Sequence, residues 1–101
     1  MYYIYILTNI KKTVLYTGVT NDLVRRILEH YQSRGIRNNF ASRFACFNLV
    51  YFEEYYHSNT AIEREKEIKN WRREKKIQLI RTQNPGLDFL NESLFDKWPP
   101  D

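Results

Sequence analysis

The sequence predicts an α/β protein of the α+β type, in which a small three-stranded antiparallel β-sheet is flanked by α-helices. Residues 2–8, YYIYILT, are aromatic and β-branched, as is typical of a strand. A polar turn at residues 9–12 joins them to a second apolar run at 13–19, and this short connection favours an antiparallel hairpin. Residues 47–56, FNLVYFEEYY, supply the third strand. Helical periodicity in the remaining segments supplies the flanking helices.

The first helix follows the hairpin directly. Thr20, Asn21 and Asp22 are successive candidates for its N-cap. The helix then runs to about Tyr31, and its apolar residues fall on one face, as expected for a helix packed on a sheet. Residues 32–45 are basic and poor in periodicity, which predicts a surface loop with a short helical turn near 40–44.

The second half of the chain predicts further helix and a tail. Asn59 or Thr60 caps a helix over 61–71, and 72–83 continues helical, so that one long helix or two would fit. Asn84-Pro85-Gly86 ends this run, because proline and glycine disfavour helix interiors. We therefore expect one domain over 1–86 and an acidic, aromatic tail over 87–101 that packs on the domain or extends from it.

Composition limits the class of protein. A chain of 101 residues is long enough for one domain with a modest core. Its single cysteine, Cys46, cannot form an internal disulfide and is expected to be buried. No signal peptide is evident, and no apolar run approaches the roughly 20 residues of a membrane span. These features favour a cytoplasmic protein with no membrane partner, and they leave its oligomeric state open.

Charge is distributed unevenly along the chain. Residues 1–83 hold 15 Lys and Arg against 8 Asp and Glu, a balance of +7, whereas residues 84–101 balance to −3. A basic body attracts polyanions such as nucleic acid. The arginines expected to contact nucleic acid lie in the first helix, the loop and the late helix, namely Arg25, Arg34, Arg37, Arg72 and Arg73. A solvated basic surface is the alternative interpretation.

A few side chains could carry chemistry. Tyr3 and Tyr5 share one face of the first strand because side chains alternate along a strand. Arg26 and His30 lie one helical turn apart at the rim of the apolar face, where a guanidinium could bind phosphate and an imidazole could transfer a proton. Glu65 is the one carboxylate of its helix inside the apolar sector, where it needs a cation or a salt bridge, for example to Arg26.

These residues resemble the motifs of the GIY-YIG endonuclease superfamily. The likeness, which covers about residues 2–86 and is closest to small stand-alone bacterial members, rests on features in chain order: Tyr3-Ile4-Tyr5, Tyr16-Thr17-Gly18, Arg26, His30 and Glu65. Asn84 is similar to an asparagine late in the family's domain. The chain departs from the name motifs where Tyr3 replaces the first glycine and Thr17 replaces isoleucine.

The resemblance implies a metal-dependent endonuclease that hydrolyses phosphodiester bonds in DNA. Glu65 would hold one Mg²⁺ or Mn²⁺, and Arg26 would neutralise transition-state charge. Tyr5 would act as general base and Tyr16 as an orienting donor, or the reverse, with His30 assisting proton transfer. Gly18 and Asn84 would support the site. Branched or nicked DNA, in repair or recombination, is the expected substrate.

Two other functions would also fit the sequence. A non-catalytic nucleic-acid-binding module could retain this fold without turnover. An interaction protein could use the aromatic acidic tail as its contact surface. The complete set of tyrosine, arginine, histidine and glutamate side chains favours the nuclease.

Overall fold

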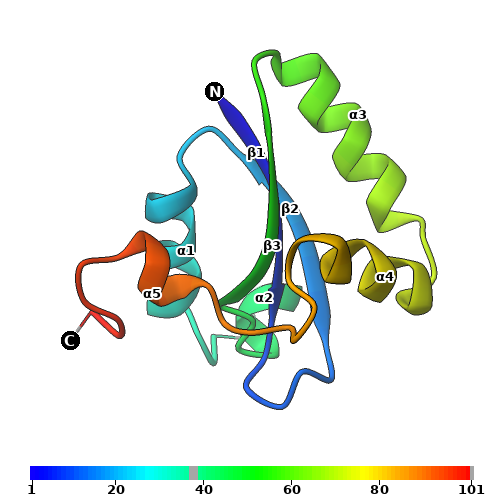
Figure 1. Cartoon of the computed structure of the whole chain (residues 1–101). Helices are drawn as coiled ribbons and strands as arrows, with labels where there is room; N and C mark the ends of the chain where they lie inside the picture. The colour runs from blue at the N-terminus through cyan, green and yellow to red at the C-terminus, as the bar shows by residue number, and fades with distance from the viewer. Residues whose placement is uncertain (37–38, 101) are drawn as a thin grey trace.

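The protein forms a three-stranded sheet between two layers of helices (Figure 1), which confirms the predicted fold class. The computed structural model describes residues 1–36 and 39–100. Its elements in chain order are β1 (Tyr2–Thr8), β2 (Leu15–Thr20), α1 (Leu23–Gln32), α2 (Phe40–Arg43), β3 (Asn48–Tyr55), α3 (Ser58–Lys69), α4 (Arg73–Gln83) and α5 (Asn91–Leu94).

The sheet has the strand order β2-β1-β3, and both pairings are antiparallel. Tyr5 of the central strand β1 pairs with Gly18 of β2 and with Phe52 of β3. The β1–β3 register shifts between Ile6 and Leu7, as at a β-bulge. Because β1 is central, its residues from Ile4 onward are buried, and their side chains alternate between the two helical layers.

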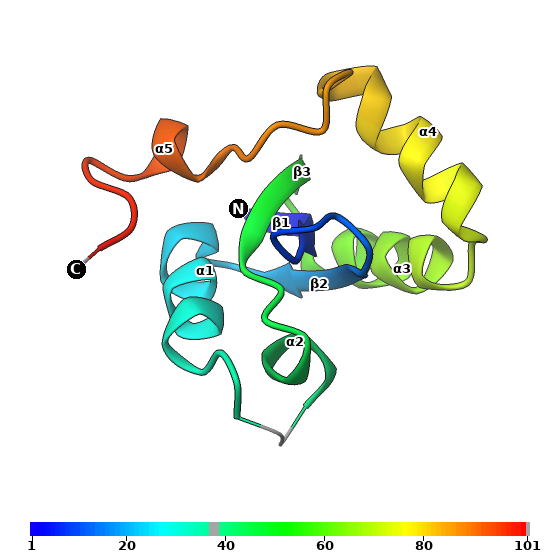
Figure 2. The same ribbon diagram turned by 90° about the horizontal axis from the view of Figure 1, so that it is seen from below.

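Each face of the sheet is covered by its own helices (Figure 2). Ile4 and Ile6 point to the face that carries α3 and α4, where Ala61, Ile68 and Ile80 complete one core. Tyr5 and Leu7 point to the opposite face, where the second core also contains residues of α1 and α2. Tyr5 is therefore a buried phenol, with only 1% of its surface exposed.

Local hydrogen bonds explain where the first elements begin. The side-chain oxygen of Asn9 accepts the backbone N–H groups of Thr13 and Val14 at 2.9 and 3.1 Å, so β2 starts at Leu15 and not at 13. Asp22 is the N-cap of α1, because its carboxylate accepts the N–H of Arg25 at 3.1 Å.

The late helices are two separate elements. α3 begins at Ser58, with His57 as an N-cap that makes no side-chain capping bond, and it ends at Lys69. Arg72 then adopts an extended conformation before α4 begins at Arg73. The chain therefore turns at residues 70–72, which settles the choice between one helix and two. Among the described residues no helix is long and apolar enough to cross a membrane.

The tail packs along the sheet. Leu87 and Phe89 join the α3/α4 core, and Leu90, Leu94, Phe95 and Trp98 join the α1/α2 core. Buried asparagines fix it: Asn84 donates to the carbonyl of Val50 at 2.9 Å, and Asn91 accepts the N–H of Leu49 at 2.8 Å and donates to Phe47 O at 3.0 Å. Cys46 is buried, as expected.

Candidate active site

The β1–β2 pair places the ring of Tyr5 directly over Gly18. A Cβ added at Gly18 would lie 2.4 Å from both the Cζ and the hydroxyl of Tyr5. Only a residue without a side chain leaves that space, so the glycine of the Tyr16-Thr17-Gly18 motif lets the phenol cross β2 towards the edge of the sheet.

The hydroxyl of Tyr5 joins the two functional side chains of α1. His30 Nε2 lies 3.0 Å from the Tyr5 oxygen, and Arg26 Nε donates to that oxygen at 3.3 Å. Arg26 also donates to Glu29 at 3.0 Å. The spacing of four residues puts Arg26 and His30 on the same face of α1, and this face packs on the Tyr5 side of the sheet.

Burial sets the protonation of this cluster. Burial, aided by the nearby Arg26 charge, lowers the pKa of His30 to about 4. Burial raises the pKa of Tyr5 to about 12, although the hydrogen bond from Arg26 opposes that rise. Both groups are therefore neutral at neutral pH. The phenol oxygen accepts from the guanidinium and shares a hydrogen bond with the imidazole.

Tyr16 extends the cluster towards α3. Its ring centroid lies 5.3 Å from that of His30 and 6.3 Å from that of Tyr5, and the ammonium of Lys69 lies 5.9 Å above it. The Tyr16 ring is half-buried, whereas Tyr5 is enclosed. Tyr16 is thus the phenol nearer to solvent.

Glu65 faces this cluster from α3. Its carboxylate has 15% of its side-chain surface exposed and pairs with Lys69 Nζ at 3.3 Å. Because Lys69 also lies over the Tyr16 ring, the Glu65–Lys69 pair borders the cluster on the Tyr16 side, and the charge of Glu65 adds to the rise in the pKa of Tyr5. The sequence suggested a salt bridge between Glu65 and Arg26. Arg26 instead pairs with Glu29, and Glu65 pairs with Lys69, one helical turn further along α3.

Comparisons with known proteins identify the family of the chain. The family model described as the GIY-YIG catalytic domain matches residues 1–78. This chain belongs to the GIY-YIG family. The resemblance inferred from the motifs is confirmed, and the family is one of nucleases that act on DNA and generally depend on divalent metals.

Relatives of similar size share the domain. The UPF0213 protein SSP2268 of Staphylococcus saprophyticus is 38% identical over 79 residues, which are 78% of this chain and 93% of the relative. The UPF0213 protein HQ_3675A of Haloquadratum walsbyi is 42% identical over 65 residues, which are 64% and 71% of the two chains. The solution NMR structure of the UPF0213 protein BH0048 from Bacillus halodurans superposes with a TM-score of 0.54 at 31% identity, covering 85% of this chain and 89% of that one.

The remaining site residue suggested by the family lies elsewhere. Asn84 donates to the carbonyls of Val50 and Asp88 at 2.9 and 2.8 Å and accepts the N–H of Asp88 at 3.0 Å. Its amide therefore ties the end of α4 to β3 and takes no part in the hydrogen bonds that join Arg26 and His30 to Tyr5. In this GIY-YIG protein Asn84 organises the fold around the site.

The arginines expected to bind nucleic acid differ in their surroundings. Arg25 is 71% exposed and pairs loosely with Glu29 at 3.5 Å. Arg34 lies over the Tyr31 ring at 3.8 Å, and Arg72 is exposed between α3 and α4. Arg73 donates to the carbonyls of Lys12 and Thr13. Arg37 lies outside the described residues.

Two groups of polar side chains at α3 escaped the sequence interpretation. Lys69 is the partner of Glu65, and its i,i+4 spacing could have indicated it. Glu53 of β3 receives Arg64 Nε and Nη2, both at 3.0 Å, and the hydroxyls of Tyr51 and Tyr55 at 2.5 and 2.6 Å. This second group joins β3 to α3, and no local signal in the sequence points to it.

Proposed function

We propose that the protein is a metal-dependent endonuclease that cleaves phosphodiester bonds in DNA. The observation that carries this proposal is the convergence at the β2 edge of the sheet. There Arg26 and His30 both hydrogen-bond to the hydroxyl of Tyr5, and Glu65 is paired with Lys69, which lies over the ring of Tyr16. A cation, neutral proton-transfer groups and a carboxylate around one half-buried phenol suit the handling of a phosphodiester.

The donor set fits one hard divalent ion. Among the described residues no three His, Cys, Asp or Glu side chains gather as a metal cluster, which argues against a site built from protein ligands alone. Magnesium in phosphoryl-transfer sites uses one or two carboxylates and takes its other ligands from water and phosphate. Glu65 would hold Mg²⁺ or Mn²⁺, and the ion would supply Lewis-acid activation of the scissile phosphate.

Arg26 is suited to charge on the phosphate. Its Nε is fixed by Tyr5, and its Nη1 by Glu29, so the planar guanidinium is held before substrate arrives. Its pKa is raised: burial opposes this, and the hydrogen bonds to Tyr5 and Glu29 outweigh that opposition. A cation that stays charged and needs no reorganisation stabilises the extra charge of the transition state.

The surroundings of the two tyrosines favour Tyr16, and not Tyr5, as the general base. Tyr5 is buried, its oxygen is already engaged by two side chains, and its pKa is about 12, so it is a poor base in the free protein. Tyr16 is half-buried beside His30 and Lys69 and is the phenol that solvent can reach. We assign Tyr16 to the attacking water and Tyr5 to positioning Arg26 and His30. Neutral His30 can accept a proton at its unprotonated ring nitrogen.

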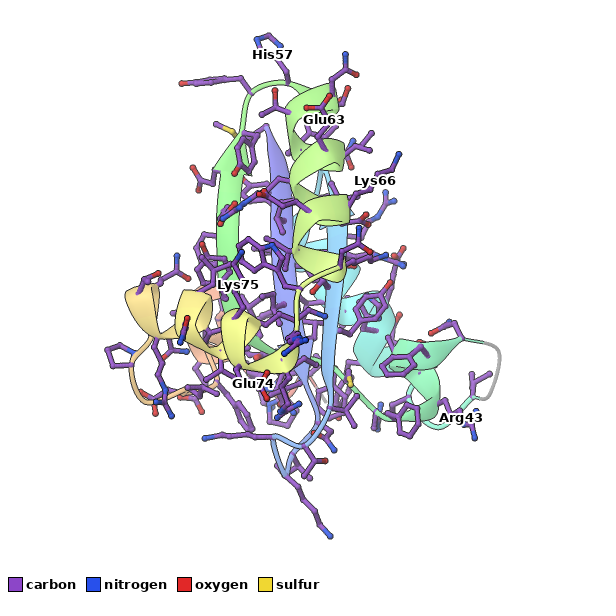
Figure 3. All side chains as sticks on the ribbon, turned by 90° about the vertical axis from the view of Figure 1, so that its right-hand side faces the viewer. Arg43, His57, Glu63, Lys66, Glu74 and Lys75 are labelled. Carbon is purple, nitrogen blue, oxygen red and sulfur yellow. The ribbon has the colours of Figure 1, made fainter. Side chains whose placement is uncertain are left out.

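The test is cleavage of plasmid, nicked and branched DNA with Mg²⁺ or Mn²⁺. Glu65→Gln and Arg26→Gln are expected to lose about 1,000-fold in rate, the size of effect seen when a preorganised charge is removed from a site. Glu63→Gln is the matched control, because Glu63 lies on the same helix but projects outward (Figure 3) and should cleave like the wild type.

Two outcomes would overturn the proposal. One is undetectable cleavage by the wild type on all three DNA forms, which would favour the non-catalytic binding module. The other is equal cleavage by Glu65→Gln and Glu63→Gln. Repair or recombination remains the proposed setting, and activity on branched or nicked DNA well above that on intact duplex would support it.

A further inference from the structure

Basic side chains of α3 and α4 lie against the start of β2, next to the proposed active site. Arg73, the first residue of α4, donates from Nη2 to the carbonyl of Lys12 at 2.9 Å and from Nη1 to that of Thr13 at 3.1 Å. Lys69, the last residue of α3, lies 5.9 Å above the ring of Tyr16. Two cations from either side of the α3–α4 turn are therefore held against residues 12–16.

Lys76 completes this group. It lies one turn after Arg73 on α4, so both side chains project from the same side of that helix. Lys76 is half-buried, and burial together with the charges of Arg73 and Lys69 lowers its pKa. The charges of Arg73 and Lys69 therefore act on Lys76, as expected for residues that lie one turn apart on α4 and at the adjoining end of α3.

The three cations have fewer carboxylate partners than positive charges. Lys69 pairs with Glu65 at 3.3 Å, whereas in the described part of the chain no carboxylate comes within ion-pair distance of Arg73 or Lys76. Lys76 is the half-buried member of the group, and a half-buried cation repelled by two neighbouring cations raises the free energy of the folded protein unless an anion joins it. Arg73 shows that the arrangement is fixed, because its guanidinium is anchored on backbone carbonyls and leaves its charge unneutralised.

We propose that Lys69, Arg73 and Lys76 form a binding site for a second phosphate group of the nucleic-acid strand, adjacent to the phosphate that is cleaved. The proposal rests on the proposed function, since it takes the Tyr16–Glu65 region as the place of cleavage. A phosphodiester is the anion that a nuclease meets there, and lysine serves as a point-charge phosphate ligand.

The pair between Lys69 and Glu65 connects this site to the metal ligand. The ammonium and a divalent ion would compete for the same carboxylate, so a cation at Glu65 frees Lys69 for phosphate. Arg73 and Lys76 need no such release. We therefore expect Lys76 to contribute to DNA binding with or without a divalent ion, and Lys69 to contribute more when an ion is present.

The test is DNA affinity measured by fluorescence anisotropy over a salt series, in EDTA and in Ca²⁺, with a labelled nicked duplex. Lys76→Gln is expected to weaken binding about fivefold and to reduce the slope of log Kd against log salt by about 0.9, the loss of one phosphate contact. Lys76→Arg keeps the charge and should keep the slope. Lys69→Gln should reduce the slope more in Ca²⁺ than in EDTA.

Lys75→Gln is the matched control, because Lys75 belongs to the same helix but lies 4.2 Å over the ring of Trp71. It should bind within about twofold of the wild type, as expected for a charge outside the contact surface. Equal slopes for Lys76→Gln and Lys75→Gln, with both proteins folded by circular dichroism, would overturn the phosphate site. Because these measurements need no cleavage, they separate failure of this site from failure of the nuclease proposal.

Discussion

Two equally buried carboxylates lie on opposite sides of α3, and they differ in the side chains that pair with them. Figure 3 shows α3 in front of the sheet, with β3 on one side and β2 on the other. On the β3 side, Glu53 has 15% of its side-chain surface exposed and accepts hydrogen bonds from Arg64, Tyr51 and Tyr55. On the β2 side, Glu65 is also 15% exposed, but its ion-pair partner is a lysine at 3.3 Å, half-exposed itself.

This difference separates a carboxylate that holds the fold from one that is available to a ligand. Burial alone would raise the pKa of Glu53, but the bonds from Arg64, Tyr51 and Tyr55 outweigh it and the pKa is lowered. Arg64 also bonds to Glu67 at 2.7 Å and lies over the Trp71 ring at 5.1 Å. The β3 flank thereby fixes the rotation of α3, which keeps the neighbouring residue Glu65 turned towards Tyr16.

The largest stability effect should come from the β3 flank. Glu53→Gln leaves the largely buried Arg64 guanidinium with the more exposed Glu67 as its countercharge, so we expect a loss of about 2 kcal/mol in unfolding free energy. Urea denaturation measures it. Cleavage per folded molecule should change far less than in Glu65→Gln. A loss below about 1 kcal/mol would mean that this ion pair is solvent-screened and does not hold the helix.

Acidification should lower the free energy of unfolding through His30, on the α1 side of the same site. The unfolded imidazole of His30 takes up a proton near pH 6.5, whereas the buried one does so near pH 4, so between these values the unfolded state binds more protons. Stability is therefore retained above about pH 6.5 and should fall by about 2 kcal/mol on acidification to about pH 4.5. Urea unfolding at several pH values tests this. His57→Gln, at an exposed histidine, should keep the fall, and His30→Gln should reduce it.

A smaller effect is expected where Lys69 competes for Glu65. Lys69→Met removes the ammonium and keeps most of the side chain's bulk. The apparent Kd for Mn²⁺, followed by paramagnetic broadening of NMR signals, should fall about two- to fivefold, which corresponds to the free energy of one partly exposed ion pair. Lys66→Met, a change at an outward-facing lysine (Figure 3), should leave the Kd unchanged. Weaker Mn²⁺ binding by Lys69→Met would contradict the competition.

The smallest effect should be the change in unfolding free energy caused by Glu65→Gln. Only the pair with Lys69 is lost, so the unfolding free energy should stay within about 0.5 kcal/mol of the wild type. Measured beside Glu53→Gln under identical conditions, it compares the two flanks directly. A loss as large as that of Glu53→Gln would show that Glu65 is part of the fold's support.

Sequence reasoning reached the parts of the site that depend on local spacing. The four-residue step from Arg26 to His30 and the motif glycine at Gly18 follow from the chain itself, and the three strands follow from apolar runs. The partner of Glu65 could not be read from the sequence, because the choice between Arg26 and Lys69 depends on how α3 lies over β2. The Glu53–Arg64 pair depends on the approach of β3 to α3. The apolar tail residues indicated packing, but the strand they contact emerged only in three dimensions.

The asparagine bonds of the tail define the length of the cooperative folding unit. The family match ends at residue 78, yet the amides of Asn84 and Asn91 satisfy backbone groups of Phe47, Leu49 and Val50 in and beside β3. Cutting the chain at 78 would leave these buried groups without partners and would uncover both cores. We therefore expect dissection of the protein at the motif boundary to give a chain without a sharp unfolding transition. We expect the piece that folds by itself to be longer than the piece that the family model matches.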